Sequence, residues 1–198
     1  MILIPHYINL SYKSGRMADS IDWAAITAKL PTDKSDSDQK AKRKELFSGF
    51  DPNGNGVLSL AETEKGIRDV LQLDEVFDAK PAIIRAFQIA KNVTKSTRSD
   101  GVGDDYIEFR EFRFFLLSLR QYFEYWAAFM RTDADGDRRI NLQEFLAAKE
   151  KIMQWVGPIG DMEGEFKKID KNGGGYILFD EFVQWAISKN LDLEDDDD

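Results

Sequence analysis

The chain contains no cysteine and a single histidine, His6, and these absences exclude much of the common chemistry of enzymes and zinc sites. Without a thiol there is no disulfide, no thiolate zinc site, no cysteine nucleophile and no site for palmitoylation. One histidine in the N-terminal tail does not make a histidine-based catalytic or metal site. The sequence also lacks a glycine-rich phosphate-binding loop, so we expect no enzymatic activity and assign no catalytic residue.

Long apolar runs are also absent, and the chain has no stretch of about 18 apolar residues that would span a membrane. The opening Met1-Ile2-Leu3-Ile4-Pro5 is too short for the apolar core of a signal peptide. Residue 2 is isoleucine where N-myristoylation requires glycine, so we expect no acyl anchor on the chain as written. A peripheral contact with a membrane stays compatible with these features.

Positive charge is scarce, because 36 acidic residues face 27 basic ones, which gives a net charge of −9 and a pI of about 4.8. Nucleic acid is bound by basic surfaces, so it is not an expected partner. The surplus of carboxylates suits a protein that binds cations. With 198 residues, 42% of them hydrophobic, and 14 phenylalanines, we expect a packed, monomeric, cytoplasmic protein of one domain or two small ones.

The most acidic motif is the twelve-residue stretch from Asp133 to Glu144. Ca²⁺ takes six to eight oxygen ligands, and a helix-loop-helix supplies them from positions 1, 3, 5, 7, 9 and 12 of such a loop. The predicted ligands are Asp133, Asp135, Asp137, the carbonyl of Arg139, Asn141 and Glu144. Position 6 holds Arg138 instead of glycine, and a non-glycine residue with a positive φ costs on the order of 1 kcal/mol. Taken alone, the stretch also fits an acidic surface turn.

Two further stretches have the same frame. Residues 51–62 fit the full pattern D-x-[DN]-x-[DN]-G-x₅-E, with glycine at position 6. Their predicted ligands are Asp51, Asn53, Asn55, the carbonyl of Val57, Ser59 and Glu62. Residues 170–181 offer Asp170, Asn172, the carbonyl of Tyr176 and Glu181. Gly174 leaves position 5 of that loop without a side-chain ligand, which a water molecule can replace.

A fourth stretch, residues 100–111, keeps the frame but loses ligands. Val102 at position 3 has no side-chain oxygen, and Asp105 stands where glycine is expected at position 6. We therefore expect about three Ca²⁺ sites in the chain. Mg²⁺ is the competing ion, and its small octahedral shell fits poorly with a bidentate glutamate.

The fourfold repetition excludes the acidic-turn interpretation. Each stretch has glutamate at position 12 and an aliphatic residue at position 8, where paired loops form a short antiparallel bridge. The four position-8 residues are Leu58, Ile107, Ile140 and Ile177. Independent acidic turns would not share this register.

Over about residues 38–190 the chain resembles the EF-hand superfamily, and within it the flagellar calcium-binding proteins of trypanosomatids, the calflagins. The similarity rests on residues 44–47, residues 106–112, the loop at Asp133 and residues 179–189. It implies an all-α fold of four EF-hands in two paired lobes, and a flagellar or cytoskeletal location. That family has an acylated N-terminus that begins Met-Gly, with a cysteine nearby, and this chain has neither.

The expected organisation has four parts. Residues 1–37 form a flexible leader with a short helix at 20–30, residues 38–119 the first EF-hand pair, residues 120–190 the second pair, and residues 191–198 a disordered acidic tail. Residues 112–130 are predicted to form two helices or one long bent helix. Residues 142–155 are predicted to form a single helix.

Two functions fit such a chain. In a Ca²⁺ sensor the helices after the loops rotate and open an apolar groove for a protein partner or a membrane, whereas in a Ca²⁺ buffer or structural protein the hands barely open. The predicted groove residues are Trp126, Phe129, Met130, Phe145, Met153, Trp155, Phe182 and Trp185. The helix around Ile21 and Trp23 is a candidate to occupy a groove in one Ca²⁺ state. The sequence favours the sensor.

Overall fold

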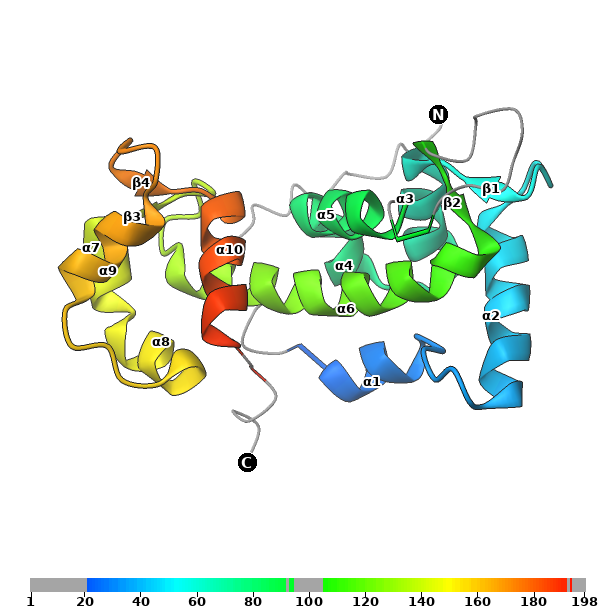
Figure 1. Cartoon of the computed structure of the whole chain (residues 1–198), viewed down its shortest axis with the longest axis horizontal. Helices are drawn as coiled ribbons and strands as arrows, with labels where there is room; N and C mark the ends of the chain where they lie inside the picture. The colour runs from blue at the N-terminus through cyan, green and yellow to red at the C-terminus, as the bar shows by residue number, and fades with distance from the viewer. Residues whose placement is uncertain (1–20, 92, 95–104, 192, 194–198) are drawn as a thin grey trace, which may run out of the picture.

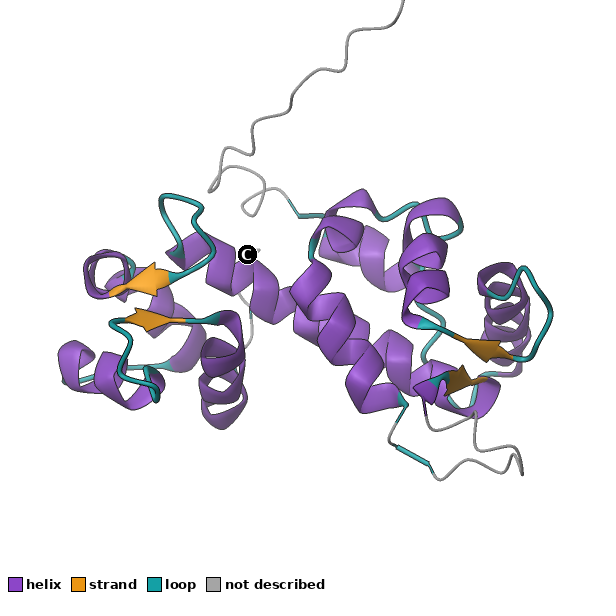
Figure 2. Ribbon diagram, turned by 90° about the horizontal axis from the view of Figure 1, so that it is seen from above, coloured by secondary structure: helices purple, strands orange, loops and turns teal. Residues whose placement is uncertain are grey.

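The computed structural model describes residues 21–91, 93, 94, 105–191 and 193, which form ten helices and four two-residue strands. The strands form two separate antiparallel pairs, one at each end of the long central helix α6 (Phe109–Thr132), as Figure 2 shows. Each strand pair joins two helix-loop-helix units. This is the predicted all-α architecture of four EF-hands in two lobes.

The first lobe contains α2 (Ser37–Phe50), α3 (Leu60–Asp69), α4 (Asp74–Asp78) and α5 (Lys80–Ala90). Strands β1 (Val57–Leu58) and β2 (Ile107–Glu108) pair Leu58 with Ile107. The second lobe contains α7 (Leu142–Ala147), α8 (Lys149–Val156), α9 (Met162–Ile169) and α10 (Phe179–Lys189). Strands β3 (Ile140–Asn141) and β4 (Tyr176–Ile177) pair Ile140 with Ile177, so all four position-8 residues form the predicted bridges.

Helix α6 belongs to both lobes. Its 24 residues form one unbroken helix, which follows the loop of the second hand and precedes the loop of the third. Of the two alternatives predicted for residues 112–130, the structure has the single helix. The boundary predicted between residues 119 and 120 falls inside this helix. In Figure 1, α6 crosses the middle of the molecule with α5 on one side and α1 (Trp23–Ala28) on the other. One continuous helix thereby connects the two lobes.

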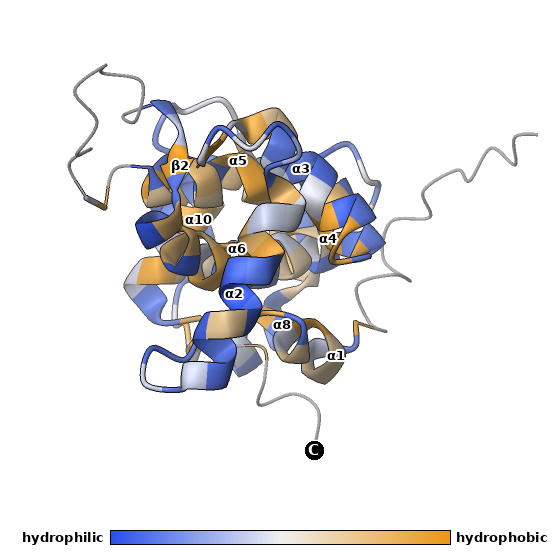
Figure 3. Cartoon of the chain, turned by 90° about the vertical axis from the view of Figure 1, so that its right-hand side faces the viewer, coloured by the Kyte–Doolittle hydropathy of each residue, from blue (hydrophilic) through white to orange (hydrophobic). Residues whose placement is uncertain are grey.

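Helix α2 begins earlier than the sequence predicts. The carboxylate of Asp36 accepts hydrogen bonds from the N–H groups of Asp38 and Gln39, so this residue caps the helix within the residues predicted to be a flexible leader. The helix carries Arg43, Phe47 and Phe50 on its buried face, and its other residues are mostly polar, as the blue of α2 in Figure 3 shows.

The helix predicted for residues 142–155 is divided in two. Ala148, with φ −83° and ψ 6°, separates α7 from α8. A second difference lies after α10, where Leu191 and Leu193 are buried although a disordered tail was predicted from residue 191. Both leucines pack into the hydrophobic core. The sequence does not reveal this packing, because the two leucines alternate with acidic residues. Residues 194–198 and the predicted leader residues 1–16 lie outside the described residues.

Aromatic rings meet one another in the core of both lobes. In the first lobe, the rings of Phe47 and Phe50 meet Phe112 edge to face, with centroids 5.3 Å apart in both pairs. In the second lobe, Phe129 meets Phe179 and Phe182 edge to face at 5.6 Å. Aromatic pairs in such geometry contribute about 0.5–1.5 kcal/mol beyond burial of their surface. In each lobe these rings therefore hold the helix before the first loop against the helix after the second loop.

Among the described helices, none combines the length and the apolar character required to cross a membrane.

Candidate metal centres

Each of the four loops ends on a glutamate held by the same backbone contact. The Oε2 atom of the position-12 glutamate accepts a hydrogen bond from the N–H at position 9 in all four loops: Ser59 to Glu62 at 2.9 Å, Glu108 to Glu111 at 3.0 Å, Asn141 to Glu144 at 2.9 Å and Leu178 to Glu181 at 3.0 Å. The contact fixes the carboxylate at the first turn of the following helix. The loops differ in what the other oxygen, Oε1, contacts.

In the loop at residues 133–144, Oε1 of Glu144 faces across the loop. It accepts hydrogen bonds from the N–H groups of Ala134, at 3.0 Å, and Asp135, at 3.2 Å. One carboxylate oxygen each from Asp133, Asp135 and Asp137 lies within 4.8 Å of the others, and no other such cluster is found in the described part of the chain. A convergent set of hard carboxylate oxygens fits Ca²⁺.

Asp133, the first residue of this loop, is fully buried. Its carboxylate accepts hydrogen bonds from the N–H groups of Gly136 and Arg138, both at 2.9 Å. Burial raises the pKa of Asp133 above its usual range, the two hydrogen bonds oppose this shift, and the charges of Glu144 and Asp137 raise the pKa further. A bound cation would stabilise the ionised form that burial and these neighbouring charges disfavour.

Two arginines modify the same loop. Arg138 has a φ of 65°, in the left-handed region that disfavours side chains with a Cβ. Arg139 extends its guanidinium toward Asp137, with Nη2 2.7 Å from Oδ2, and lies over the ring of Tyr176 in the paired loop, 4.6 Å from the centroid. Arg139 thus offsets part of the charge of one predicted ligand while linking the two loops of the lobe.

The loop at residues 51–62 has its glutamate held by a side chain. Oε1 of Glu62 accepts a hydrogen bond from Nδ2 of Asn53 at 2.6 Å, and its Oε2 also accepts one from the hydroxyl of Ser59 at 2.8 Å. Asp51 accepts from the N–H groups of Asn55 and Gly56. Gly56 has a φ of 80°, which explains the glycine at position 6. Asp51, Asn53, Ser59 and Glu62 are therefore in one hydrogen-bonded turn.

The loop at residues 170–181 repeats the geometry of the Asp133 loop. Oε1 of Glu181 accepts from the N–H groups of Lys171, at 3.1 Å, and Asn172, at 3.3 Å. Asp170 accepts from the N–H groups of Gly174 and Gly175. This loop therefore places the carboxylates of Asp170 and Glu181 around the same backbone turn, with no side chain at position 5.

The second hand holds its glutamate in another way. Glu111 is buried, and its Oε1 accepts a hydrogen bond from the hydroxyl of Thr94 at 2.6 Å. Thr94 lies before the loop. In the third and fourth hands the donors to Oε1 are N–H groups of the loop itself, whereas in the second hand the donor is this side chain from outside the loop. Asp105 forms an ion pair with Lys91 at 3.2 Å, while Asp100 and Val102 lie outside the described residues. No sequence pattern pointed to Thr94.

The predicted groove residues lie mostly inside the second lobe. All of them except Met153 are buried, and Met153 is partly buried against the same cluster. The Trp126 ring stacks on Phe129, while Trp185 meets Phe145 and Phe182. Their role as a groove stays a prediction.

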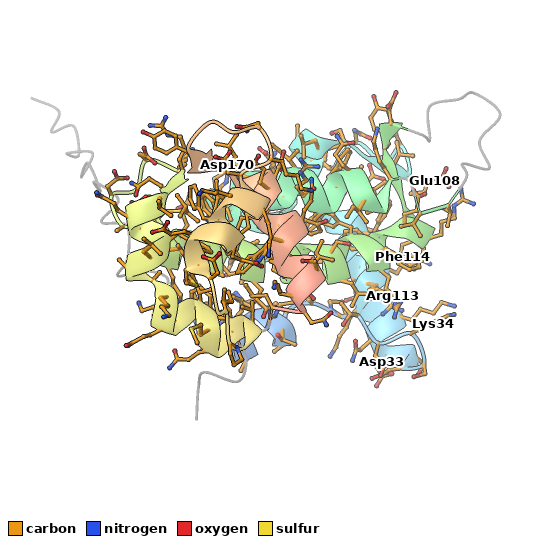
Figure 4. All side chains as sticks on the ribbon, turned by 60° about the vertical axis from the view of Figure 1, so that its left-hand side comes forward. Asp33, Lys34, Glu108, Arg113, Phe114 and Asp170 are labelled. Atoms are coloured by element: carbon orange, nitrogen blue, oxygen red, sulfur yellow. The ribbon has the colours of Figure 1, made fainter. Side chains whose placement is uncertain are left out.

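The ligands also stay predictions, but the loops that carry them occupy opposite ends of the molecule. Figure 4 labels Asp170 in the second lobe and Glu108 in the first, far apart along the long axis. The predicted ligands therefore lie in two separate regions, each built on one strand pair.

Comparisons with known proteins agree with this geometry. The family model of the FCaBP EF-hand domain matches residues 26–119. The flagellar calcium-binding proteins TB-24 and TB-1.7G of Trypanosoma brucei brucei are each 39% identical over 180 residues, which is 90% of this chain and 81% and 77% of theirs. The flagellar calcium-binding protein of Trypanosoma cruzi is 35% identical over 177 residues, 89% of this chain and 83% of its own. The chain is a calcium-binding EF-hand protein and belongs to the family of trypanosomatid flagellar calcium-binding proteins.

Proposed function

We propose that the protein is a Ca²⁺ sensor that binds the ion at the loops beginning at Asp51, Asp133 and Asp170. The observation that carries the proposal is the position of the last glutamate in each loop. Its carboxylate touches the backbone of position 9 and a residue at position 2 or 3, so it spans the loop from the helix that follows. A cation drawn to that carboxylate acts directly on the helix.

The helix after the fourth loop carries the largest consequence. Two residues before Glu181, Phe179 packs edge to face on Trp126, with centroids 5.2 Å apart, and one residue after it Phe182 packs on Phe129. A movement of Glu181 would therefore change the packing of α10 on α6. In a sensor this repacking exposes apolar surface to a protein partner.

A buffer is the second candidate, and the burial of the aromatic cluster favours it. The rings of the second lobe already contact one another closely, and a protein that only stores Ca²⁺ would keep them so. The sensor is the stronger proposal because the rings that would be exposed belong to the helix attached to the metal ligand.

The family relationship supports a flagellar location as a further part of the proposal. The relatives are named for the flagellum, and their similarity covers nine tenths of this chain. The partner that we propose is a protein at that site.

Binding of a hydrophobic dye to the full chain tests the sensor. We expect Ca²⁺ to increase dye fluorescence in the native chain and to increase it much less in Glu181→Gln. The matched control is Glu163→Gln, an exposed residue of α9, which should behave like the native chain. If Ca²⁺ binds but dye fluorescence does not change, the protein is a buffer.

A further inference from the structure

Helix α1 makes few turns and depends on its contacts. It has six residues, Trp23–Ala28, capped by the carboxylate of Asp22. Isolated helices of this length are not stable in water, because the few hydrogen bonds they form do not offset the unfavourable free energy of helix nucleation. The helix is therefore maintained by the surface on which it lies.

The buried side chains of this segment have a recognisable spacing. Trp23 and Ile26 are buried within α1, and Leu30, two residues after its end, is buried too, which gives positions i, i+3 and i+7. This is the spacing of the anchor residues that an amphipathic helix inserts into the groove of another protein. Thr27, at i+4, also faces α6, because its hydroxyl accepts a hydrogen bond from Nε of Arg120 at 3.3 Å. The segment has the chemistry of a bound peptide.

The surface beneath α1, here called the α1 seat, consists of Phe123 and Arg120 on α6 and the carbonyls of Leu71 and Gln72 after α3. The Trp23 ring meets Phe123 at 5.5 Å, and the guanidinium of Arg120 lies over the same ring at 4.3 Å. Nζ of Lys29 donates to the two carbonyls at 2.9 and 3.1 Å. The α1 seat thus combines an aromatic contact, a cation–π contact and two acceptors for an amine.

We propose that the α1 seat is a docking surface for an amphipathic helix of a partner protein, and that α1 occupies this surface as an intramolecular ligand. The partner helix carries a bulky aromatic residue followed by apolar residues three and seven positions later. A lysine six positions after the aromatic residue would reach the two carbonyls. The surface lies on α6, the helix shared by both lobes.

The α1 seat is connected to the end of the chain. Arg120 Nη1 donates to Oε2 of Glu124 at 3.3 Å, and Oε1 of this buried carboxylate accepts a hydrogen bond from the N–H of Leu193 at 2.6 Å. Leu193 lies four residues after α10, the helix that begins beside Glu181. A movement of α10 would therefore act through Glu124 on Arg120, the residue that covers Trp23.

This link to Ca²⁺ rests on the proposed sensor function, whereas the docking surface itself does not. A partner helix must compete with α1 for the α1 seat. Because α1 is part of the same chain, its effective concentration at this surface is on the order of millimolar. Weakening α1 should therefore strengthen binding of a peptide in trans.

The test uses the full chain and a fluorescently labelled peptide with the sequence of residues 21–31. We expect the peptide to bind Trp23→Ala at least tenfold more tightly than the native chain, and a peptide with alanine at the tryptophan position to bind neither. Lys29→Met, which removes only the amine contacts, should give a smaller increase and covers the case in which Trp23→Ala does not fold. Lys34→Met, an exposed lysine of the following segment, is the matched control and should bind like the native chain.

Two outcomes overturn the proposal. One is a folded Trp23→Ala or Lys29→Met chain that binds the peptide no better than the native chain. The other is equal binding of the peptide that lacks tryptophan. A Ca²⁺ titration of the same samples distinguishes this failure from failure of the sensor, because the metal sites can be intact while the α1 seat binds no peptide.

Discussion

Arg138 is the position at which one substitution should make the protein more stable. Its φ of 65° is unfavourable for any residue with a Cβ, at a cost of roughly 1–2 kcal/mol. Replacement by glycine removes this cost but gives the unfolded chain more freedom, which takes back about 0.4–1 kcal/mol. The net gain expected for Arg138→Gly is about 0.5–1 kcal/mol in the free energy of unfolding.

The hydrogen bond at this position survives the change, because the backbone N–H of residue 138 is the donor to Asp133 at 2.9 Å. Urea unfolding at saturating Ca²⁺, followed by circular dichroism, measures the gain. Arg138→Gln separates charge from backbone, since it removes the guanidinium and keeps the Cβ. We expect it to gain little.

The equivalent position of the fourth loop provides the reverse experiment. Gly175 has a φ of 81°, and a Cβ added there would meet no atom within 4 Å, so only the backbone conformation opposes a side chain. Gly175→Ala should lose about 1 kcal/mol or more. The reasoning is refuted if Arg138→Gly is no more stable than Arg138→Gln, or if Gly175→Ala is as stable as the native chain.

Three further substitutions test contacts outside the loops. Ion pairing with Lys189 is the main cause that lowers the pKa of Glu165 from 4.5 to about 2. The ionised carboxylate therefore stabilises the fold above pH 4.5 by at most about 3 kcal/mol, and this stabilisation is lost as the pH falls toward 2. In denaturant titrations, the stability difference between the native chain and Glu165→Gln should shrink over that range, and a constant difference would contradict the assignment. Thr94→Val should cost about 1–3 kcal/mol in thermal unfolding because buried Glu111 loses a partner, with Thr94→Ser as the control that must remain near native. Arg85→Met removes the interlobe ion pair with exposed Asp180 and should lower the free energy of unfolding by less than about 1 kcal/mol. This difference should disappear at high salt, which screens exposed charges, so a larger loss of stability that does not depend on salt would contradict the prediction.

The loops were predictable because their chemistry is local. Twelve consecutive residues carry the ligands, the turn and the position-8 residue, so the register of both strand pairs followed from aligning Leu58 with Ile107 and Ile140 with Ile177. The positive φ of Arg138 followed from the same alignment. Short-range patterns of this kind contain all the information that the local backbone requires.

Contacts between distant segments were not predictable in the same way. The hydroxyl of Thr94 meets Glu111, and the N–H of Leu193 meets Glu124, across 17 and 69 residues of sequence. Nothing in the composition around Thr94 or Leu193 distinguishes them from exposed loop residues. The short helix α4 and the break at Ala148 also depend on packing, since neither contains proline or a strong helix-ending signal.

The central claim is that three of the four loops bind Ca²⁺, and a calorimetric titration of the full chain with Ca²⁺ tests it most directly. The account predicts about three sites in the native chain and one fewer in Glu144→Gln, with Glu150→Gln, a residue of α8 outside any loop, unchanged. An unaltered stoichiometry in Glu144→Gln, or a fourth site that disappears with Glu111→Gln, would contradict it.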